Sequence, residues 1–173
     1  MKICITGGIA CGKSLLSQFL NELGIETIDA DDVVHELIPA DERRRLAKSV
    51  FKDPAARRAL EARIHPLVKT RIVDFLSSPH SAVRFAVIPL LFEVHWESEF
   101  DIICCVASSR ENQIARMVRD RGMSREEAED RIAAQMPVAE KAAKSHYVIE
   151  NDGTPEDLRE QVVKFVDWLK SRS

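Results

Sequence analysis

Several features that would define other classes of protein are missing from this sequence. No stretch comes near the roughly 20 consecutive apolar residues of a membrane-spanning helix. There are no internal repeats or low-complexity tracts, and the start, MKICIT, lacks the separate apolar region of a cleavable secretion signal. At 173 residues, we therefore expect a single-domain cytoplasmic protein with no membrane partner.

Cysteine is scarce, and the positions of the four cysteines argue against a zinc site and against a disulfide framework. No pair has the spacing of zinc ligands, and the adjacent Cys104 and Cys105 make a poor disulfide framework. These two and Cys4 lie in apolar runs, which predicts buried, reduced thiols. Cys11 lies in a glycine-rich loop instead, where we expect the N–H groups of a helix start to lower the pKa of its thiol.

The net charge is only −3, but it is unevenly distributed. Residues 41–71 hold ten Lys and Arg against four Asp and Glu. This local excess favours an anionic partner at the segment, and a solvated helical face that happens to be basic fits the same pattern.

Short apolar runs alternate with amphipathic stretches along the whole chain. The apolar runs predict strands over residues 2–6, 26–29, 84–88, 102–106 and 147–150. The amphipathic stretches predict helices over 13–23, 31–37, 41–51, 54–64, 66–77, 110–121 and 124–135, and two more that begin at Pro137 and near Pro155. Pro66 should begin a helix of its own, which leaves His65 at a break. Continuous apolar strands separated by helices are typical of a three-layer α/β fold, with a parallel sheet covered on both faces.

The clearest motif follows the first predicted strand. Gly7, Gly12, Lys13 and Ser14 match the pattern G-x-x-x-x-G-K-[ST], between a strand and a helix, which is the context this motif requires. The glycines let backbone N–H groups point at phosphate oxygens, at the positive end of the following helix. Lys13 is expected to reach the β- and γ-phosphates, and the Ser14 hydroxyl to bind Mg²⁺. The predicted contacts to ATP are Gly8, Ile9, Ala10, Cys11, Gly12, Lys13, Ser14 and Leu15.

The motifs of other nucleotide-binding classes are absent. A GTPase would have a D-x-x-G switch and a guanine-reading N-K-x-D, and this sequence has neither. A motor-type ATPase would have an apolar strand that ends in a carboxylate, but the third predicted strand ends Ile88-Pro89 and the fourth runs into Ala107-Ser108. These absences favour a small-molecule kinase.

A cluster of acids follows the second predicted strand. The carboxyl end of that strand should face the same crevice as the phosphate loop, because the ends of parallel strands meet at one edge of a sheet. Asp31 is therefore predicted to be the catalytic base or to hold magnesium-bound water, whereas Asp29 is expected to cap the next helix.

Arginines are frequent in residues 110–144, and most should pair with neighbouring acids on helix surfaces. A kinase lid nonetheless needs one or two arginines at the transferring phosphate. Arg116 and Arg131 are the best candidates.

Together these residues resemble the dephospho-coenzyme A kinase family. The resemblance covers nearly the whole chain and rests on ordered motifs: TGGIxxGKS at 6–14, LGIxxIDAD at 23–31, VVHEL at 33–37, LExxIHP at 60–66, PLLFE at 89–93, RIAAQMP at 131–137 and VIEN at 148–151. It implies a P-loop kinase fold with a helical acceptor-binding insertion and a helical lid. The implied division of the single domain is a core of residues 1–30, 83–110 and 146–173, an acceptor-binding region of 31–82 and a lid of 111–145.

The resemblance also implies an activity, the ATP- and Mg²⁺-dependent phosphorylation of the ribose 3′-hydroxyl of dephospho-coenzyme A. It makes Asp31 the base, places Arg131 in the lid and sets Asn151 at a turn that borders the adenine of ATP. The acceptor-binding residues it implies are His65, Leu90, Leu91, Phe92 and Glu93. The basic segment 41–71 would then serve an acceptor that carries a pyrophosphate. We expect no nucleic-acid partner, and a monomer is favoured.

The sequence departs from the family pattern at several places. The family usually reads G-G-I-G-S-G-K-S-T, so Ala10 replaces a glycine, and a positive φ there would cost about 1–2 kcal/mol. Asp120-Arg121 stands where Arg-Asp is more common, and the stretch between Asp31 and His65 is shorter than usual. Two other functions therefore stay open: a kinase for another acceptor, such as a nucleoside monophosphate or a sugar, and a nucleotide-binding regulator without turnover.

Overall fold

The computed structural model describes residues 1–38, 54–78 and 83–172. The predicted helix over residues 41–51 lies outside these ranges. The chain divides into two compact units, one of residues 1–27 and 82–173 and the other of residues 28–81. Within the described ranges, no helix combines the length and the apolar character that crossing a membrane requires.

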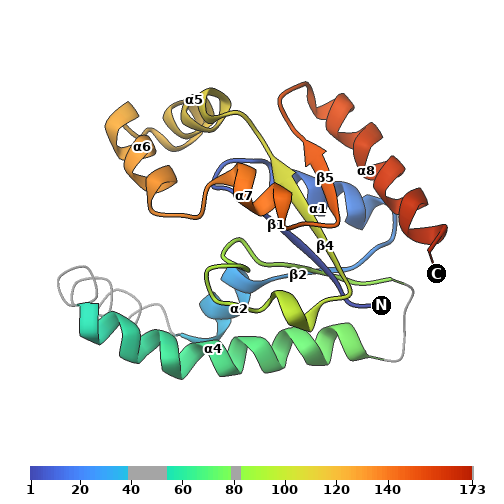
Figure 1. Ribbon diagram of the computed structural model, residues 1–173, viewed down its shortest axis with the longest axis horizontal. Coiled ribbons are helices and arrows are strands. Elements are labelled where there is room, and N and C mark those ends of the chain that lie inside the picture. The colour runs from blue at the N-terminus through green and yellow to red at the C-terminus, as the bar shows by residue number, and fades with distance from the viewer. Residues whose placement is uncertain (39–53, 79–82, 173) are drawn as a thin grey trace. The chain divides into compact units, whose positions relative to one another are not determined.

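Five strands form one sheet, close to the predicted positions (Figure 1). In chain order they are β1 (Ile3–Gly7), β2 (Thr27–Asp29), β3 (Phe85–Val87), β4 (Ile102–Ala107) and β5 (Tyr147–Glu150). Their order across the sheet is β2-β3-β1-β4-β5, and β1 pairs in parallel with both β3 and β4. β1 is therefore central and fully buried, and its carboxyl end opens directly into the predicted phosphate loop.

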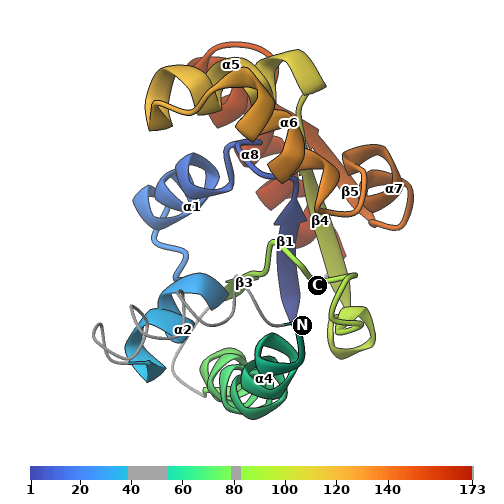
Figure 2. The same cartoon turned by 90° about the vertical axis from the view of Figure 1, so that its left-hand side faces the viewer.

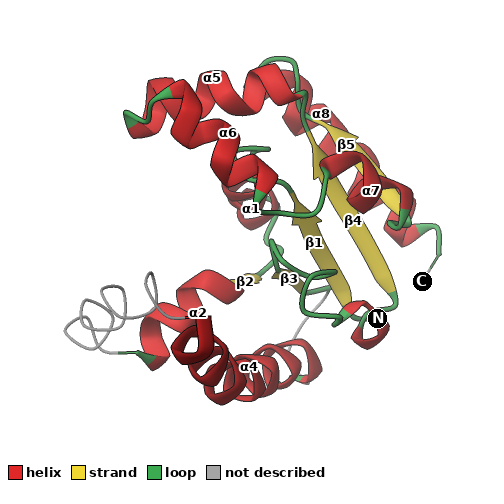
Figure 3. Ribbon diagram, turned by 60° about the vertical axis from the view of Figure 1, so that its left-hand side comes forward, coloured by secondary structure: helices red, strands yellow, loops and turns green. Residues whose placement is uncertain are grey.

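Helices cover both faces of the sheet in the first unit. α1 (Lys13–Glu22) and α8 (Pro155–Lys170) pack on one face, where Ile5 of β1 and Phe165 of α8 belong to the same apolar core. α7 (Val138–Ala143) contacts β4 and β1, and Figure 3 shows it on the opposite side of β4 and β5 from α8. The parallel, doubly covered sheet confirms the predicted α/β class.

Two further helices lie beyond the carboxyl ends of β1 and β4 (Figure 2). α5 (Arg110–Arg121) and α6 (Arg125–Ala133) pack against each other, and their buried contact consists of Ile114, Met117 and Ala128. This small core brings α5 and α6 to the edge of the sheet at which the phosphate loop begins.

The second unit holds α2 (Ala30–Leu37) and α4 (Pro54–Ser77), which pack against each other. α2 begins as predicted, because the Asp29 carboxylate accepts a hydrogen bond from the backbone N–H of Asp31 at 2.8 Å. An N-cap of this kind typically contributes about 1 kcal/mol to helix stability.

The predicted helix break before Pro66 is wrong, because α4 continues through the proline. A proline in a helix interior removes one hydrogen bond and crowds the preceding turn, at a cost of about 3 kcal/mol. Ile64, Val68 and Ile72 are buried at four-residue spacing on both sides of Pro66. Burying three such side chains contributes about 4–9 kcal/mol, so the continuous apolar stripe outweighs the proline.

Candidate functional site

The loop between β1 and α1, residues 8–12, curls tightly. Gly7 and Gly12 have φ angles of 145° and 97°, which favour glycine. A Cβ on Gly12 would run into the side chain of Asn151, so the loop has no room for another residue there. Ala10 has a φ of 58°, and this left-handed conformation costs a non-glycine residue about 1–2 kcal/mol. Ala10 therefore has the positive φ that the sequence analysis named as the source of strain at this position.

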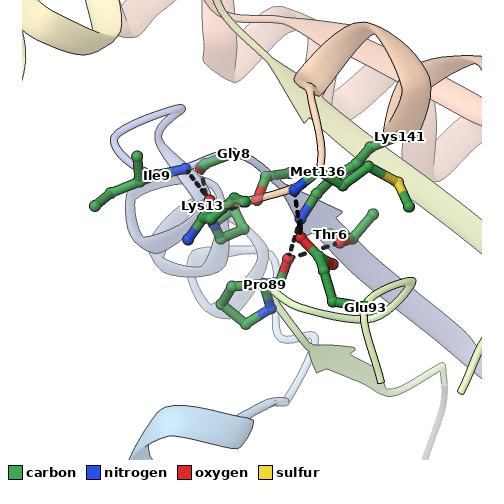
Figure 4. A network of polar contacts seen from close by, with 10 residues as sticks. Thr6, Gly8, Ile9, Lys13, Pro89, Glu93, Met136 and Lys141 are labelled. Carbon is green, nitrogen blue, oxygen red and sulfur yellow. Dashed lines mark hydrogen bonds and ion pairs between the residues drawn. The ribbon is translucent and has the colours of Figure 1, made fainter. Parts of the chain in front are cut away.

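The start of α1 combines a cation with backbone N–H groups. Lys13 Nζ donates to the carbonyl oxygens of Gly7 at 3.0 Å and Gly8 at 2.7 Å, so the side chain folds back over the loop (Figure 4). The N-cap residue is Gly12, which has no side chain to cap the helix, and the first turn holds no acidic residue. The first N–H groups of a helix lack intrahelical partners and carry the positive end of its dipole. With Ser14 exposed in the same turn, the arrangement suits a phosphate and a cation bound to it.

Four side chains from distant parts of the chain hold the loop in shape, and we call them the loop clamp: Gln113, Arg116, Gln135 and Asn151. Gln113 Nε2 donates to the carbonyl of Ile9 at 2.7 Å, and Gln135 Oε1 accepts from the N–H of Ile9 at 3.0 Å. Arg116 donates to the carbonyl of Ala10 at 3.1 Å. Asn151 Nδ2 donates to the carbonyl of Cys11 at 2.9 Å. The loop is thus preorganised by contacts that the protein makes with itself.

The turn after β5 is itself bound to the start of α5. Asp152 Oδ1 accepts hydrogen bonds from the Ser108 hydroxyl at 2.6 Å and from the Ser109 backbone at 2.8 Å. It also accepts one from Asn112 Nδ2 at 2.8 Å. Slight burial acts to raise the pKa of Asp152, but these hydrogen bonds outweigh it and lower the pKa to about 2.

A cavity of about 460 Å³ adjoins the phosphate loop beside this turn. Its lining includes Gly12, Leu15, Arg116, Asn151, Gly153 and Pro155. The volume lies within the range of about 300–1,000 Å³ that is typical of small-molecule sites. Because the cavity adjoins the loop that would hold the phosphates, it suits the base and sugar of a nucleotide.

The two arginines selected from the sequence have different surroundings. Arg116 is engaged by backbone carbonyls, since besides Ala10 it donates to Asn151 O at 2.6 Å. Arg131 is exposed in the last turn of α6. Asp120, at the position where the family more often has arginine, is exposed and accepts a hydrogen bond from Arg119 at 2.6 Å.

The prediction that the Cys11 thiol has a lowered pKa is wrong. Cys11 has no exposed surface, and burial raises the pKa of its thiol, although Lys13 and a backbone hydrogen bond act in the opposite direction. All four cysteines are buried and reduced, as predicted for Cys4, Cys104 and Cys105. Burial raises the pKa of Cys105 to about 12, so this thiol is protonated at neutral pH.

The loop after β3 carries the PLLFE motif. Leu91 and Phe92 are buried, with 0% and 2% of their surface exposed, whereas Leu90 is 38% exposed. Glu93 pairs with Lys141 of α7 at 2.8 Å. The motif therefore combines two core residues, one accessible leucine and one carboxylate that is already bound.

Two neighbouring acids of the second unit are open to solvent. Asp31 and Asp32 are both exposed in the first turn of α2. His65 is partly buried within α4. Asp31 thus has the accessibility that a general base requires.

Sequence reasoning missed Gln113, Gln135 and Lys141. Two of them carried a readable signal. Gln113 stands beside Ile114 on the buried face of α5, and Lys141 interrupts an alanine-rich turn of α7. A polar side chain on an apolar face indicates a buried hydrogen bond, because buried polar groups are almost always paired.

Proteins of known name match nearly the whole chain. A sequence profile of the family described as Dephospho-CoA kinase matches residues 1–42 and 39–157. The dephospho-CoA kinase of Geobacter metallireducens is 39% identical over 187 residues, which cover 93% of this chain and 92% of the relative. That of Symbiobacterium thermophilum is 38% identical over 185 residues, which cover 92% of this chain and 77% of the relative.

Solved structures agree. TT1252 from Thermus thermophilus aligns with a TM-score of 0.83 and 34% identity, over 98% of this chain and 97% of that one. Dephospho-CoA kinase from Campylobacter jejuni aligns over 100% of both chains, with a TM-score of 0.75 and 25% identity. A shikimate kinase from Bacteroides thetaiotaomicron, 16% identical with a TM-score of 0.63 over 98% of both chains, shares the fold. The sequence profile, the relatives and the structures together place this chain in the dephospho-CoA kinase family.

Proposed function

We propose that this protein transfers the γ-phosphoryl group of ATP to the ribose 3′-hydroxyl of dephospho-coenzyme A, giving coenzyme A and ADP. The observation that carries the proposal is the phosphate loop, with Gly12 at the N-cap and Lys13 at the start of α1, in a chain that belongs to this family. We further propose that the protein acts as a cytoplasmic monomer on small molecules, without a nucleic-acid or membrane partner.

The donor half of the reaction follows from the loop. The N–H of Ile9 is taken by Gln135, so the phosphates are bound by the other backbone N–H groups of the loop and of the first turn of α1. Lys13 exchanges its bonds to loop carbonyls for bonds to the β- and γ-phosphates. The cavity beside Asn151 receives the adenosine. Because the transition state of phosphoryl transfer is loose, this positioning and the positive charge contribute more than covalent chemistry.

Mg²⁺ is the cation that we assign to Ser14. Within the described ranges, no group of three His, Cys, Asp or Glu side chains could hold a metal ion. Mg²⁺ suits such a place, because it keeps several waters and is bound by few protein ligands together with substrate phosphates. When bound, it neutralises charge on the phosphate oxygens.

For the acceptor half we assign the base to Asp31. Its exposed carboxylate takes the proton of the 3′-hydroxyl while that oxygen bonds to the γ-phosphorus and the bond to the β–γ bridging oxygen breaks. Arg131 of the lid stabilises the charge of the transferring group. His65 and Leu90 keep accessible surface and contact the acceptor, whereas the buried Leu91 and Phe92 shape the loop from the core.

An acceptor panel tests the proposal. ADP release from Mg-ATP is measured with dephospho-coenzyme A, nucleoside monophosphates and sugars, and the site of phosphorylation is read by mass spectrometry and ³¹P NMR. We expect turnover with dephospho-coenzyme A and a loss of about 10²–10³-fold in Lys13→Ala, because a group that stabilises transition-state charge is removed. Turnover confined to another acceptor would reject the proposal. Retained ATP binding without any turnover would favour a regulator.

A further inference from the structure

A fully buried lysine joins separate parts of the first unit. Lys141, in α7, has no exposed surface. Its Nζ donates to the carbonyl of Pro89 at 2.6 Å and pairs with Glu93 Oε1 at 2.8 Å (Figure 4). Thr6 Oγ1 donates to the same Pro89 carbonyl at 3.4 Å. The loop after β3 is therefore tied both to α7 and to β1.

Glu93 extends this contact to the segment between α6 and α7. Its Oε1 also accepts a hydrogen bond from the N–H of Met136 at 3.0 Å. The preceding residue, Gln135, accepts from the N–H of Ile9 at 3.0 Å. Two consecutive residues are thus fixed to different partners, one to the loop after β3 and one to the phosphate loop. We call residues 134–137 the pivot.

The pivot follows α6 directly and so sets where that helix ends. α6 packs on α5 through Ala128, and Ile9 and Ala10 of the phosphate loop pack against the same small core. Arg131 lies in the last turn of α6, next to the pivot. Any displacement of the pivot therefore moves Arg131 relative to the phosphate loop.

Stability alone does not account for the charged pair. Glu93 Oε2 is buried, and within the described part of the chain it has no hydrogen-bond partner. A buried acceptor without a donor lowers stability, and apolar residues in place of a buried ion pair are often neutral or stabilising. The geometry that the pair imposes on Met136 and Pro89 is what an apolar pair would lose.

We propose that Glu93 and Lys141 are positioning residues for phosphoryl transfer, which fix the pivot and thereby the place of α6 and Arg131. The inference rests on the proposed function. It gives Glu93 a different role from acceptor binding, because its carboxylate acts on the reaction through Met136 and Lys141.

Three variants test this role: Glu93→Gln, Lys141→Met and the double variant. Glu93→Gln keeps an acceptor for Met136 but leaves the buried ammonium without its counter-charge, and Lys141→Met releases the Pro89 carbonyl. We expect either change to lower kcat about 10–100-fold, because small misplacements of a charge-stabilising group are costly. KM for ATP should stay within about twofold of wild type, because Lys13 and three of the four clamp residues, Gln113, Arg116 and Asn151, lie outside the pivot. Glu97→Gln, in the same loop, is the matched control and should leave kcat unchanged.

The double variant separates positioning from stability. It contains no unpaired charge at this place, so its Tm should return toward that of wild type. Its kcat should stay as low as in the single variants, because residues that act as one unit are not additive. Recovery of kcat together with Tm would overturn the proposal, and so would a loss equal to the product of the two single losses.

A readout without turnover keeps this result separate from the proposed function. If wild type fails with dephospho-coenzyme A, the proposed function is rejected. Amide hydrogen exchange at residues 134–136 with bound ATP then still tests the pivot. We expect faster exchange in all three variants than in wild type, and unchanged exchange would refute the role of the pair.

Discussion

The phosphate loop is shaped by side chains far away in the sequence, whereas the acidic turn after β2 is shaped by its own neighbours. The side chains that hydrogen-bond to the backbone of Ile9 and Cys11 come from residues that follow their partners in the sequence by 104 to 140 positions. The N–H of Asp31 is bound by Asp29, two positions before it. One region depends on the assembly of the whole first unit, and the other needs only a short piece of chain.

This difference suits the two tasks. A phosphate loop must present several N–H groups in fixed directions, because reorganisation during the reaction would cost rate. A general base needs one accessible carboxylate within reach of the proton. Substitutions in the loop clamp should therefore change ATP binding and stability together, and a substitution of the acid should change turnover alone.

The largest effect is expected at the acid. Asp31→Asn should lower kcat by about 10²–10⁴-fold, the usual contribution of general base catalysis. Its Tm should stay within about 1 °C of wild type, because the side chain is exposed and surface substitutions shift stability little. Steady-state kinetics with dephospho-coenzyme A and thermal denaturation check both parts.

Asp32→Asn is the matched control for this change. The two aspartates are adjacent, both exposed and in the same helix turn. We expect Asp32→Asn to keep kcat within about twofold. Equal losses in both variants would mean that negative charge near the start of α2 matters, and that no single base does.

A smaller and mixed effect is expected at the loop clamp. Arg116→Met keeps the aliphatic stem but removes the donors to Ala10 O and Asn151 O. Leaving such carbonyls unpaired costs about 1–3 kcal/mol, which is a Tm decrease of about 2–10 °C in a domain of this size. KM for ATP should rise about tenfold. Arg125→Met, whose arginine is 59% exposed and pairs with Glu111 and Glu129 on the surface, should change neither quantity.

Asp152 holds the turn next to Asn151 of the loop clamp, and its contribution to stability should depend on pH. The pKa of Asp152 is about 2, below its ordinary 3.8, so its charged form stabilises the folded protein above pH 4, and this contribution disappears as the pH falls toward 2. Because the group is exposed to solvent, we expect only about 1 kcal/mol. Urea unfolding at pH 6 should show Asp152→Asn less stable by this amount, and the gap should narrow at pH 3. A gap that is constant with pH would exclude the carboxylate charge as its cause.

The contrast between local and distant contacts also explains what could be predicted from the sequence. The motif from Gly7 to Ser14, the strand positions and the cap at Asp29 depend on neighbouring residues, and the structure confirms the strands and the cap. Gln113 and Gln135 were not assigned, because their partner Ile9 is identified only once β1 and α5 are packed together.

The two wrong predictions have the same origin. Reasoning from neighbouring residues alone predicted a helix boundary at Pro66 and a lowered pKa for the Cys11 thiol. Packing decided both, since the buried stripe of α4 outweighs the proline and burial of the thiol outweighs the nearby positive charge. Local rules fail where burial supplies the larger energy.

The smallest effect is expected where the loop carries strain. Ala10→Gly should relieve about 1–2 kcal/mol of left-handed strain and lose about 0.5–1 kcal/mol to the greater freedom of glycine in the unfolded chain. The net gain of about 0.5–1 kcal/mol should raise Tm by about 1–4 °C and leave KM for ATP unchanged, because the clamp holds Ala10 by its backbone carbonyl. Ala115→Gly, at an exposed position inside α5, should instead lower stability by about 1 kcal/mol. Thermal denaturation of the two variants thus compares the change from alanine to glycine in a strained loop with the same change in a relaxed helix. A decrease of equal size in both would show that the distant contacts of the clamp do not hold Ala10 in a conformation that favours glycine.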